Sequence, residues 1–242
     1  MIAPTIVLIP GNMCDASMWD GIVPELENAG WQICHADTTR DTTISAMAAR
    51  ASYNCPGPLL PVGFSMGGII ALEMARQAPE RLAGLVLLDA NPGADLPERA
   101  AARPGHQQRV RDGELETIVR DELMPVYLAD ENRDCEDLKE RIVSMALRLG
   151  EKVFVQQSEA LRTRRDNWEL LSGFDKPAFI ACGEHDVLCP PAWHQKMASE
   201  LPQAELHIIK RAAHMLPLER PDVLAMHLAS WLEACINGGE HE

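Results

Sequence analysis

A serine, an aspartate and a histidine stand in this sequence where they could together perform nucleophilic catalysis. Ser65 lies between two glycines in the stretch GFSMG, Asp186 ends the stretch GEHD, and His214 lies within AAHMLPLERPD. A serine hydroxyl attacks a carbonyl efficiently only when a neighbouring base takes its proton, and that base needs a group that orients it. The three residues, in the chain order Ser, Asp, His, are therefore predicted to form a catalytic triad.

Each of these residues follows an apolar segment that is typical of a buried strand. Segments rich in Val, Ile and Leu recur at residues 5–10, 31–36, 58–63, 84–89, 177–182 and 204–209. Amphipathic segments that suit helices lie at about 17–29, 43–53, 66–77, 191–200 and 221–235. Strands that are apolar on both faces and alternate with helices predict an α/β fold with a doubly wound, mainly parallel sheet. Ligand-binding groups collect at the carboxyl ends of such strands, where all three candidates lie.

The stretch around Ser65 has the composition of a sharp strand-to-helix turn. The strand expected at 58–63 meets the helix expected at 66–77, and such a turn forces the serine into a strained backbone conformation. Side chains at positions 63 and 67 would collide with the neighbouring strand and helix, which explains the glycines. The turn also presents the hydroxyl at a helix N-terminus, where developing negative charge is stabilised. A glycine-rich turn in which Ser65 only caps the helix is the alternative interpretation.

One long segment interrupts the alternation of strands and helices. Residues 93–173 contain stretches with helical periodicity, such as DCEDLKERIVSMALRLG, but no strand pattern. Because a structureless connection of this length is rare in a compact domain, we predict a helical cap that is inserted after the fourth strand and packs over the edge of the sheet. Residues 1–92 and 174–236 would then form the core, and residues 237–242 a flexible tail.

Three motifs together resemble the α/β-hydrolase superfamily, in particular its small capped esterase-like and lactonase-like members. They are PGNMCDASMW near the N-terminus, GFSMGG around the serine, and the pair GEHD and AAHMLPLERPD. The resemblance covers residues 5–90 and 175–235. It implies a sheet of about six parallel strands, since the sequence starts without the family's N-terminal hairpin. It also implies an oxyanion hole built from the backbone N–H groups of Asn12 and Met66, and a reaction without metal or organic cofactor.

Two stretches depart from the pattern of that family. Pro10 stands where the family usually has histidine, and a proline fixes its own φ and donates no backbone hydrogen bond. The N–H of Asn12 is retained in spite of this change. The shortened stretch HADTTRDTT after the second strand lacks the usual glycine-rich loop, which should open one side of the pocket.

Other residues compete for the roles in the triad. Asp89 ends the fourth expected strand and is the alternative carboxylate, although the GEHD context favours Asp186 and Asp89 also suits a turn. The other histidines considered as the base are His35, His185, His194, His207 and His227. Two of them lie inside an expected strand or helix, where a packed or surface imidazole is expected, and none carries the motif around His214. No combination has the spacing of metal ligands.

The substrate pocket is expected to form between the cap and the loops of the core. The residues predicted to line it are Trp19, Met124, Tyr127, Phe154, Trp168 and Leu216. Large apolar side chains at helical spacing also suit the interior of the cap itself. The neighbouring Arg162, Arg164 and Arg165 could attract a substrate carboxylate, but a run of charges more often marks a solvated face.

Composition limits the class of protein. The 242 residues carry a formal net charge of −14, which disfavours nucleic acid and anionic membranes as partners because the molecule repels polyanions. The N-terminus lacks the basic region of a signal peptide and no segment approaches a membrane span, so a soluble cytoplasmic protein is expected. Seven cysteines are scattered without C-x-x-C pairs, which predicts free thiols rather than disulfides or a zinc site.

The predicted activity is hydrolysis of a carboxylic ester, either a small-molecule ester or a lactone, through the triad and an acyl-enzyme. The same residues would also serve a thioesterase or a C–C bond hydrolase, because one fold hosts many reactions. A non-catalytic protein that binds a small ligand in the same pocket is a third interpretation.

Overall fold

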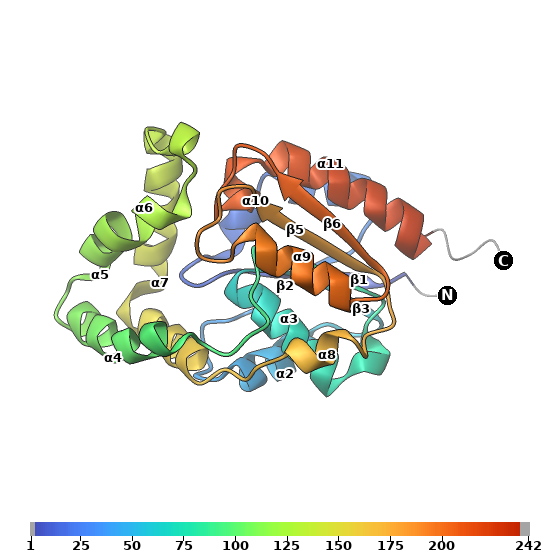
Figure 1. Ribbon diagram of the computed structural model, residues 1–242, viewed down its shortest axis with the longest axis horizontal. Helices are drawn as coiled ribbons and strands as arrows, with labels where there is room; N and C mark the ends of the chain where they lie inside the picture. The colour runs from blue at the N-terminus through green and yellow to red at the C-terminus, as the bar shows by residue number, and fades with distance from the viewer. Residues whose placement is uncertain (1–2, 238–242) are drawn as a thin grey trace.

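Six parallel strands form the sheet of the computed structural model, which describes residues 3–237 (Figure 1). The strands are β1 (Thr5–Ile9), β2 (Ile33–His35), β3 (Leu59–Phe64), β4 (Leu85–Leu88), β5 (Ala178–Gly183) and β6 (Ala204–Ile209). They lie in the order β2-β1-β3-β4-β5-β6, and every neighbouring pair is parallel. The predicted α/β fold with a parallel sheet of six strands is therefore confirmed.

Helices that connect these strands or follow the last of them lie along both faces of the sheet. They are α1 (Val23–Asn28), α2 (Ile44–Asn54), α3 (Met66–Gln77), α9 (Pro191–Glu200), α10 (Leu216–Glu219) and α11 (Pro221–Trp231). The single helix predicted at 17–29 is wrong, because this stretch forms a 3-10 turn, Ala16–Trp19, followed by α1. Gly21 lies between the two and packs closely on Pro221, since a Cβ on this glycine would lie 2.6 Å from the Cβ of that proline.

Side chains of the strands alternate between two apolar clusters, one on each face. On β1, Ile6 and Leu8 belong to one cluster and Val7 and Ile9 to the other, and all four are fully buried. The first cluster includes residues of α1 and α11, and the second includes residues of α2, α3 and α9; Figure 1 shows α11 and α9 on opposite sides of the sheet. Because burying each such side chain stabilises the fold by about 1.5–3 kcal/mol, both faces contribute to holding the strand ends in place.

Helices also fill the segment between β4 and β5, as the sequence pattern predicts. They are α4 (Pro97–Arg111), α5 (Leu115–Thr117), a π-helix (Ile118–Leu123), α6 (Met124–Tyr127), α7 (Glu136–Arg162) and α8 (Trp168–Leu171). Gly150 interrupts α7 with a φ of 76°, at the residue where the predicted stretch DCEDLKERIVSMALRLG ends. The tail predicted at 237–242 lies, from residue 238 onward, outside the described residues.

The segment from α4 to α7 contacts the loops at the carboxyl ends of the strands. Figure 1 shows these helices grouped at one end of the molecule. The N–H of Met13, in the loop after β1, donates to Gln157 on α7 at 2.8 Å. The N–H of Met215, after β6, donates to the carbonyl of Tyr127 at 3.2 Å. The inserted helices therefore lie above the end of the sheet where the candidate site residues were expected.

One disulfide corrects the prediction that all cysteines are free. Cys34 on β2 is bonded to Cys55, directly after α2, with Cα atoms 6.6 Å apart. The sequence did not reveal the pair because it has no characteristic spacing, and only the return of α2 along the sheet brings its end beside β2. The free thiols are Cys14, Cys135, Cys182 and Cys189, while the side chain of Cys235 lies outside the described residues.

Within residues 3–237, no helix combines the length and the apolar character needed to cross a bilayer.

Candidate active site

Ser65 occupies the sharp turn between β3 and α3. Its φ of 53° and ψ of −114° are unusual for a residue with a side chain, and strain of this kind concentrates at functional sites. The N–H of Ser65 donates to the carbonyl of Leu88 on β4 at 2.8 Å, and its own carbonyl accepts from the N–H of Gly68 at 2.9 Å. The turn is thereby held between a neighbouring strand and the first turn of α3.

Gly63 and Gly67 allow this turn to pack more closely than any side chain would permit. A Cβ on Gly63 would lie 2.3 Å from the carbonyl oxygen of Gly67, and a Cβ on Gly67 would lie 2.0 Å from the carbonyl oxygen of Ile9. Both obstacles are backbone atoms within the sheet and helix, so they cannot move aside. The collision predicted for side chains at positions 63 and 67 is confirmed.

His214 lies between Ser65 and Asp186 and is hydrogen-bonded to both. Its Nε2 lies 2.9 Å from the hydroxyl oxygen of Ser65, and its Nδ1 lies 2.8 Å from Oδ2 of Asp186. The imidazole and the carboxylate are almost completely buried, and they come from the loops after β6 and β5. A proton on Nδ1, facing the carboxylate, leaves Nε2 free to accept the hydroxyl proton. The structure therefore brings the three predicted residues together.

Hydrogen bonds keep the carboxyl group of Asp186 ionised. Its Oδ1 accepts from the N–H of Leu188 at 2.7 Å and from the N–H of Cys189 at 2.9 Å. Burial by itself raises the pKa of Asp186, but attraction to His214 and these hydrogen bonds outweigh it and hold the pKa below its ordinary value. An ionised carboxylate at this place stabilises the imidazolium that forms when His214 takes a proton.

Asp89, the alternative carboxylate, has a different partner. Its Oδ1 accepts from the N–H of Gly183 at 2.9 Å, and the residue is completely buried. Among the described residues, the carboxylate that contacts His214 is that of Asp186. Burial first, and then the charge of Asp186, raise the pKa of Asp89 well above its ordinary value. Asp89 is thus a buried neighbour of the site that holds its proton more strongly than an ordinary carboxyl group.

The raised pKa of the buried Asp89 makes the stability of the fold depend on pH. Its folded pKa lies above the unfolded value of about 3.9, so the folded protein keeps a proton that the unfolded chain releases. Stability then falls as pH rises between the two values, by up to about 1.4 kcal/mol per pH unit. Asp89→Asn keeps an acceptor for Gly183 and removes this titration. We expect its free energy of unfolding to gain on that of the parent as pH rises above about 4 in urea titrations, and a pH-independent difference would contradict the raised pKa of Asp89.

The loop after β1 brings further backbone groups to the serine. Asn12 and Met66 line the same cavity as Ser65, and within residues 3–237 neither backbone N–H is engaged in a hydrogen bond. Both residues therefore combine a place beside the serine with an unused backbone donor, and an oxyanion hole requires such donors.

Gln157 on α7 fixes the shape of this loop. Its side-chain oxygen accepts from the N–H of Met13, whose φ is 55°, and its side-chain nitrogen lies 3.3 Å from both oxygens of Thr38. Gln157 is completely buried, so these bonds are not exchanged with water. Sequence reasoning missed this residue because a glutamine on a helix ordinarily indicates a solvated face.

A cavity of about 280 Å³ opens onto Ser65 and His214. Its other lining residues are Asn12, Met66, Ile69, Asn91, Asp95, Arg99, Ala102, Arg103, His106, Leu123, Tyr127, Leu161, Arg164, Leu188 and Cys189. Of the six predicted pocket residues, Tyr127 belongs to this lining. Four of the other predicted residues are instead buried in one apolar cluster, namely Trp19, Met124, Phe154 and Leu216. Trp168 packs beside the opposite cluster, with the amine of Lys196 4.0 Å from the centre of its ring.

The polar side of the cavity comes mostly from α4, which the sequence did not indicate. Arg99, Ala102, Arg103 and His106 recur at the spacing of one helical face. That spacing is the only available signal, and a solvated helix face shows the same pattern. Of the three arginines singled out in the sequence, Arg164 lines the cavity, whereas Arg162 pairs with Glu159 near the surface, and Arg165 is exposed.

The remaining candidate histidines have other surroundings. The Nε2 of His194 accepts from the N–H of Ala90 at 3.0 Å, and burial lowers the pKa of His194 to about 4. The rings of His207 and His227 lie 4.3 Å apart between β6 and α11. The exposed candidates are His35 and His185.

Within residues 3–237, one group of side chains has the proximity needed to hold a metal ion. Donor atoms of Asp186, Cys189 and His214 all lie within 4.8 Å of one another. Two of these residues already bond to each other, and burial raises the pKa of the Cys189 thiol well above its ordinary value. A protonated thiol is a poor metal ligand, so this donor set fits an acid–base pair better than a metal centre.

Comparisons with known proteins agree with this architecture. The model of the alpha/beta hydrolase family matches residues 6–227. A candidate 2-succinyl-6-hydroxy-2,4-cyclohexadiene-1-carboxylate synthase of Bacillus subtilis (strain 168) is 27% identical over 179 residues. That match covers 71% of this chain and 64% of the relative, which is less than two thirds of its length. A pimeloyl-[acyl-carrier protein] methyl ester esterase of Yersinia pseudotuberculosis is 26% identical over 196 residues, which are 79% of this chain and 76% of that protein.

A solved structure extends the likeness over almost the whole chain. A thermophilic esterase from Thermogutta terrifontis, determined with malate bound, has a TM-score of 0.89 and 26% sequence identity, over 96% of this chain and 90% of that chain. The esterases among these relatives support carboxylic ester hydrolase activity. The family match spans more than half of the sequence and agrees with the parallel sheet and the strained serine turn. The chain therefore belongs to the alpha/beta hydrolase family.

Proposed function

We propose that this protein is a serine hydrolase that cleaves the carboxylic ester of a small molecule through Ser65, His214 and Asp186. The observation that carries the proposal is the continuous chain of hydrogen bonds from the Ser65 hydroxyl through both ring nitrogens of His214 to Asp186. Its members come from three separate loops at the carboxyl ends of β3, β5 and β6. A buried base that contacts both a hydroxyl and a carboxylate is the arrangement that activates a serine nucleophile.

The reaction follows from these contacts. Nε2 of His214 takes the proton of the Ser65 hydroxyl while Oγ attacks the carbonyl carbon, and Asp186 stabilises the charged imidazole. The N–H groups of Asn12 and Met66 stabilise the oxyanion of the tetrahedral intermediate. The C–O bond to the alcohol then breaks, and the alcohol leaves with the proton from His214. The products of this step are the free alcohol and an acyl-enzyme.

Water completes the cycle through the same base. His214 takes a proton from a water molecule, whose oxygen attacks the acyl group on Ser65 and forms a second tetrahedral intermediate. Its collapse releases the carboxylic acid and returns the proton to the serine.

In this proposal residues 93–173 act as a cap over a core of residues 1–92 and 174–236. The cavity of about 280 Å³ lies at the small end of the range for ligand pockets, which favours a compact ester or lactone.

Covalent labelling and a substrate panel test the proposal. We expect a fluorophosphonate probe to form an adduct that peptide mass spectrometry places on Ser65. We also expect short-chain oxygen esters or lactones to give higher kcat/KM values than matched thioesters or substrates for C–C cleavage. A higher kcat/KM for thioesters would assign thioester hydrolysis to the same residues, and a higher value for the substrates of C–C cleavage would assign that reaction to them. If no adduct forms and no substrate is turned over, the protein would be identified as a binding protein instead.

A further inference from the structure

The cavity over Ser65 is positively charged, although the protein as a whole is strongly acidic. Its lining contains the three arginines Arg99, Arg103 and Arg164 but a single carboxylate, that of Asp95, whereas the whole chain has a formal net charge of −14. Positive charge concentrated in a cleft of low dielectric attracts anions much more strongly than the same charge on an open surface. The positive charge at the cavity therefore has to be explained by what this cavity binds.

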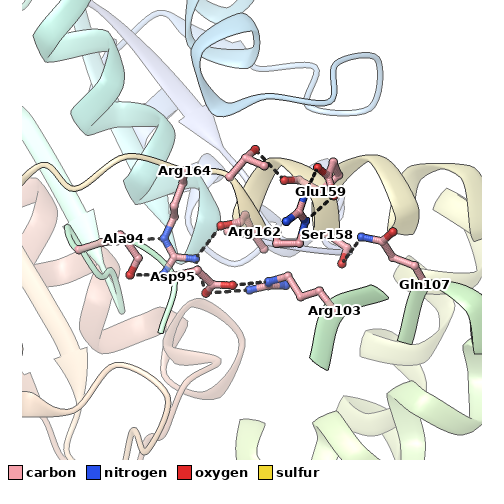
Figure 2. Close-up of polar contacts among 11 residues, drawn as sticks. Ala94, Asp95, Arg103, Gln107, Ser158, Glu159, Arg162 and Arg164 are labelled. Carbon is pink, nitrogen blue, oxygen red and sulfur yellow. Dashed lines mark hydrogen bonds and ion pairs between the residues drawn. The ribbon is translucent and has the colours of Figure 1, made fainter. Parts of the chain in front are cut away.

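Asp95 compensates only part of this charge. Figure 2 shows its carboxylate between the guanidinium groups of Arg103 and Arg164. Oδ1 accepts from Arg164 at 2.7 Å, and Oδ2 accepts from Nε of Arg103 at 2.6 Å. Arg164 also donates to the backbone carbonyls of Gly93 and Leu161. Almost all its donors are therefore used within the protein, and its role is to hold Asp95 in place.

Arg103 and Arg99 keep donors that no group in residues 3–237 accepts. Arg103 engages Asp95 through Nε and Nη2, which leaves the N–H groups of Nη1 free. Arg99 reaches only the carbonyl of Leu188, at 3.3 Å, and no carboxylate of the described residues pairs with it. The two arginines are four residues apart on α4, so they lie side by side on the face that lines the cavity.

Other arginines of the same helix show that Arg99, which lines the cavity without a carboxylate partner among the described residues, is unusual. Arg109 is compensated by Glu114 and Glu122 at the surface, and Arg111 is exposed to solvent. Like charges four residues apart destabilise a helix, and placing them at a partly enclosed cavity adds to that cost because water screens them less. A bound anion between Arg99 and Arg103 would remove both costs.

We infer that the substrate of this protein is an ester that also carries a carboxylate, held by Arg99 and Arg103 while Ser65 attacks the ester carbonyl. This inference rests on the proposed function and names its substrate class. A planar carboxylate accepts two hydrogen bonds from a guanidinium group in matching geometry. The apolar lining residues Leu123 and Leu161 suit the methylene groups between the two ends of such a molecule. Half-esters of short dicarboxylic acids have this chemistry.

Matched pairs of substrates test the inference. Monomethyl esters of the dicarboxylic acids from malonate to adipate are compared with methyl alkanoates of equal chain length. We expect kcat/KM to be about 10- to 100-fold higher for the best half-ester, because a charged hydrogen bond to a carboxylate is worth that factor. The preference should shrink when KCl is raised to about 0.5 M, since salt screens the attraction.

Substitutions on α4 locate the effect. Arg99→Gln and Arg103→Gln should each bring the ratio of the two kcat/KM values down by about tenfold or more, whereas Arg111→Gln, on the same helix but outside the cavity, should leave both values unchanged. The ratio in each variant is insensitive to a partial loss of folded enzyme. Equal kcat/KM values for charged and neutral esters, or a preference that survives both substitutions, would overturn the inference and leave the proposed function intact.

Binding of a dicarboxylate separates the two proposals. Calorimetry with glutarate or adipate, the products of the expected reaction, needs no turnover. Binding that weakens in Arg99→Gln and Arg103→Gln but not in Arg111→Gln supports the anion site, whether or not an ester is hydrolysed. If such binding is found but no ester is hydrolysed, only the proposed function fails. Absence of binding together with equal turnover of both ester types would overturn the anion site.

Discussion

Replacing Ser65 by alanine lowers kcat for the best ester by about 10⁴-fold or more, because the members of a triad act as a unit and a methyl group cannot form the acyl-enzyme. The loss should lie in kcat, with KM little changed, since the cavity keeps its shape. Steady-state kinetics and the absence of a fluorophosphonate adduct on the variant measure the effect.

A second serine provides the control for this substitution. Ser199 lies exposed on α9, where its hydroxyl bonds only to the carbonyl of Lys196. Ser199→Ala should therefore retain the labelling and the kcat of the parent. If a folded Ser65→Ala variant, judged by circular dichroism and thermal unfolding, hydrolysed esters as fast as Ser199→Ala, Ser65 would not be the nucleophile.

Asp186→Asn should lower kcat nearly as much as Ser65→Ala does. An asparagine keeps the size of the side chain, but its neutral amide no longer stabilises the imidazolium and can turn an N–H group toward His214, which then adopts the wrong tautomer. We expect kcat to fall by about 10³- to 10⁴-fold. Because the pKa of Asp186 is held below its ordinary value, the parent enzyme should not lose activity through this residue until the pH is well into the acid range.

Asp89→Asn is the matched comparison, since both aspartates lie at the carboxyl ends of neighbouring strands. Asp89 bonds to Gly183 rather than to His214, so its replacement should lower kcat by less than about tenfold. The two kcat values, measured side by side on one ester, decide which carboxylate serves the base. A larger loss in Asp89→Asn than in Asp186→Asn would reverse the assignment.

The sheet and the residues around Ser65 could be predicted because their signals are local. Each strand is a short apolar run, and a parallel sheet covered on both faces requires such runs. The glycines at 63 and 67 follow from the steric demands of one turn, and a Cβ added at position 67 would lie only 2.0 Å from a backbone oxygen, which shows how strict those demands are. The convergence of Asp186 and His214 follows from their positions after parallel strands.

The lining of the cavity could not be predicted, because it depends on how the helices between β4 and β5 pack. Large apolar residues such as Phe154 and Met124 fill the cluster beneath those helices, where they exclude water most effectively. The cavity is lined by a mixture of apolar residues, such as Leu123, and charged residues, such as Arg99 and Arg103. Whether a polar helix face meets solvent or a cleft is decided by contacts far apart in the sequence. The bond between Cys34 and Cys55 was hidden for the same reason.

Strands β4 and β5 are direct parallel neighbours, with Leu85 opposite Ala178 and Leu88 opposite Ala181. Residues 89–177 therefore leave the sheet at the carboxyl end of β4 and return to it beside the start of the same strand, only one strand length away. The entropy of closing such a loop grows only with the logarithm of its length, and each doubling adds about 0.6 kcal/mol. Insertions and deletions there cost the sheet little, while they replace the side chains above the nucleophile. Natural selection can in this way exchange one substrate for another as long as the contacts of Gln157 and Tyr127 with the catalytic loops are kept, and the region offers protein engineers the same freedom.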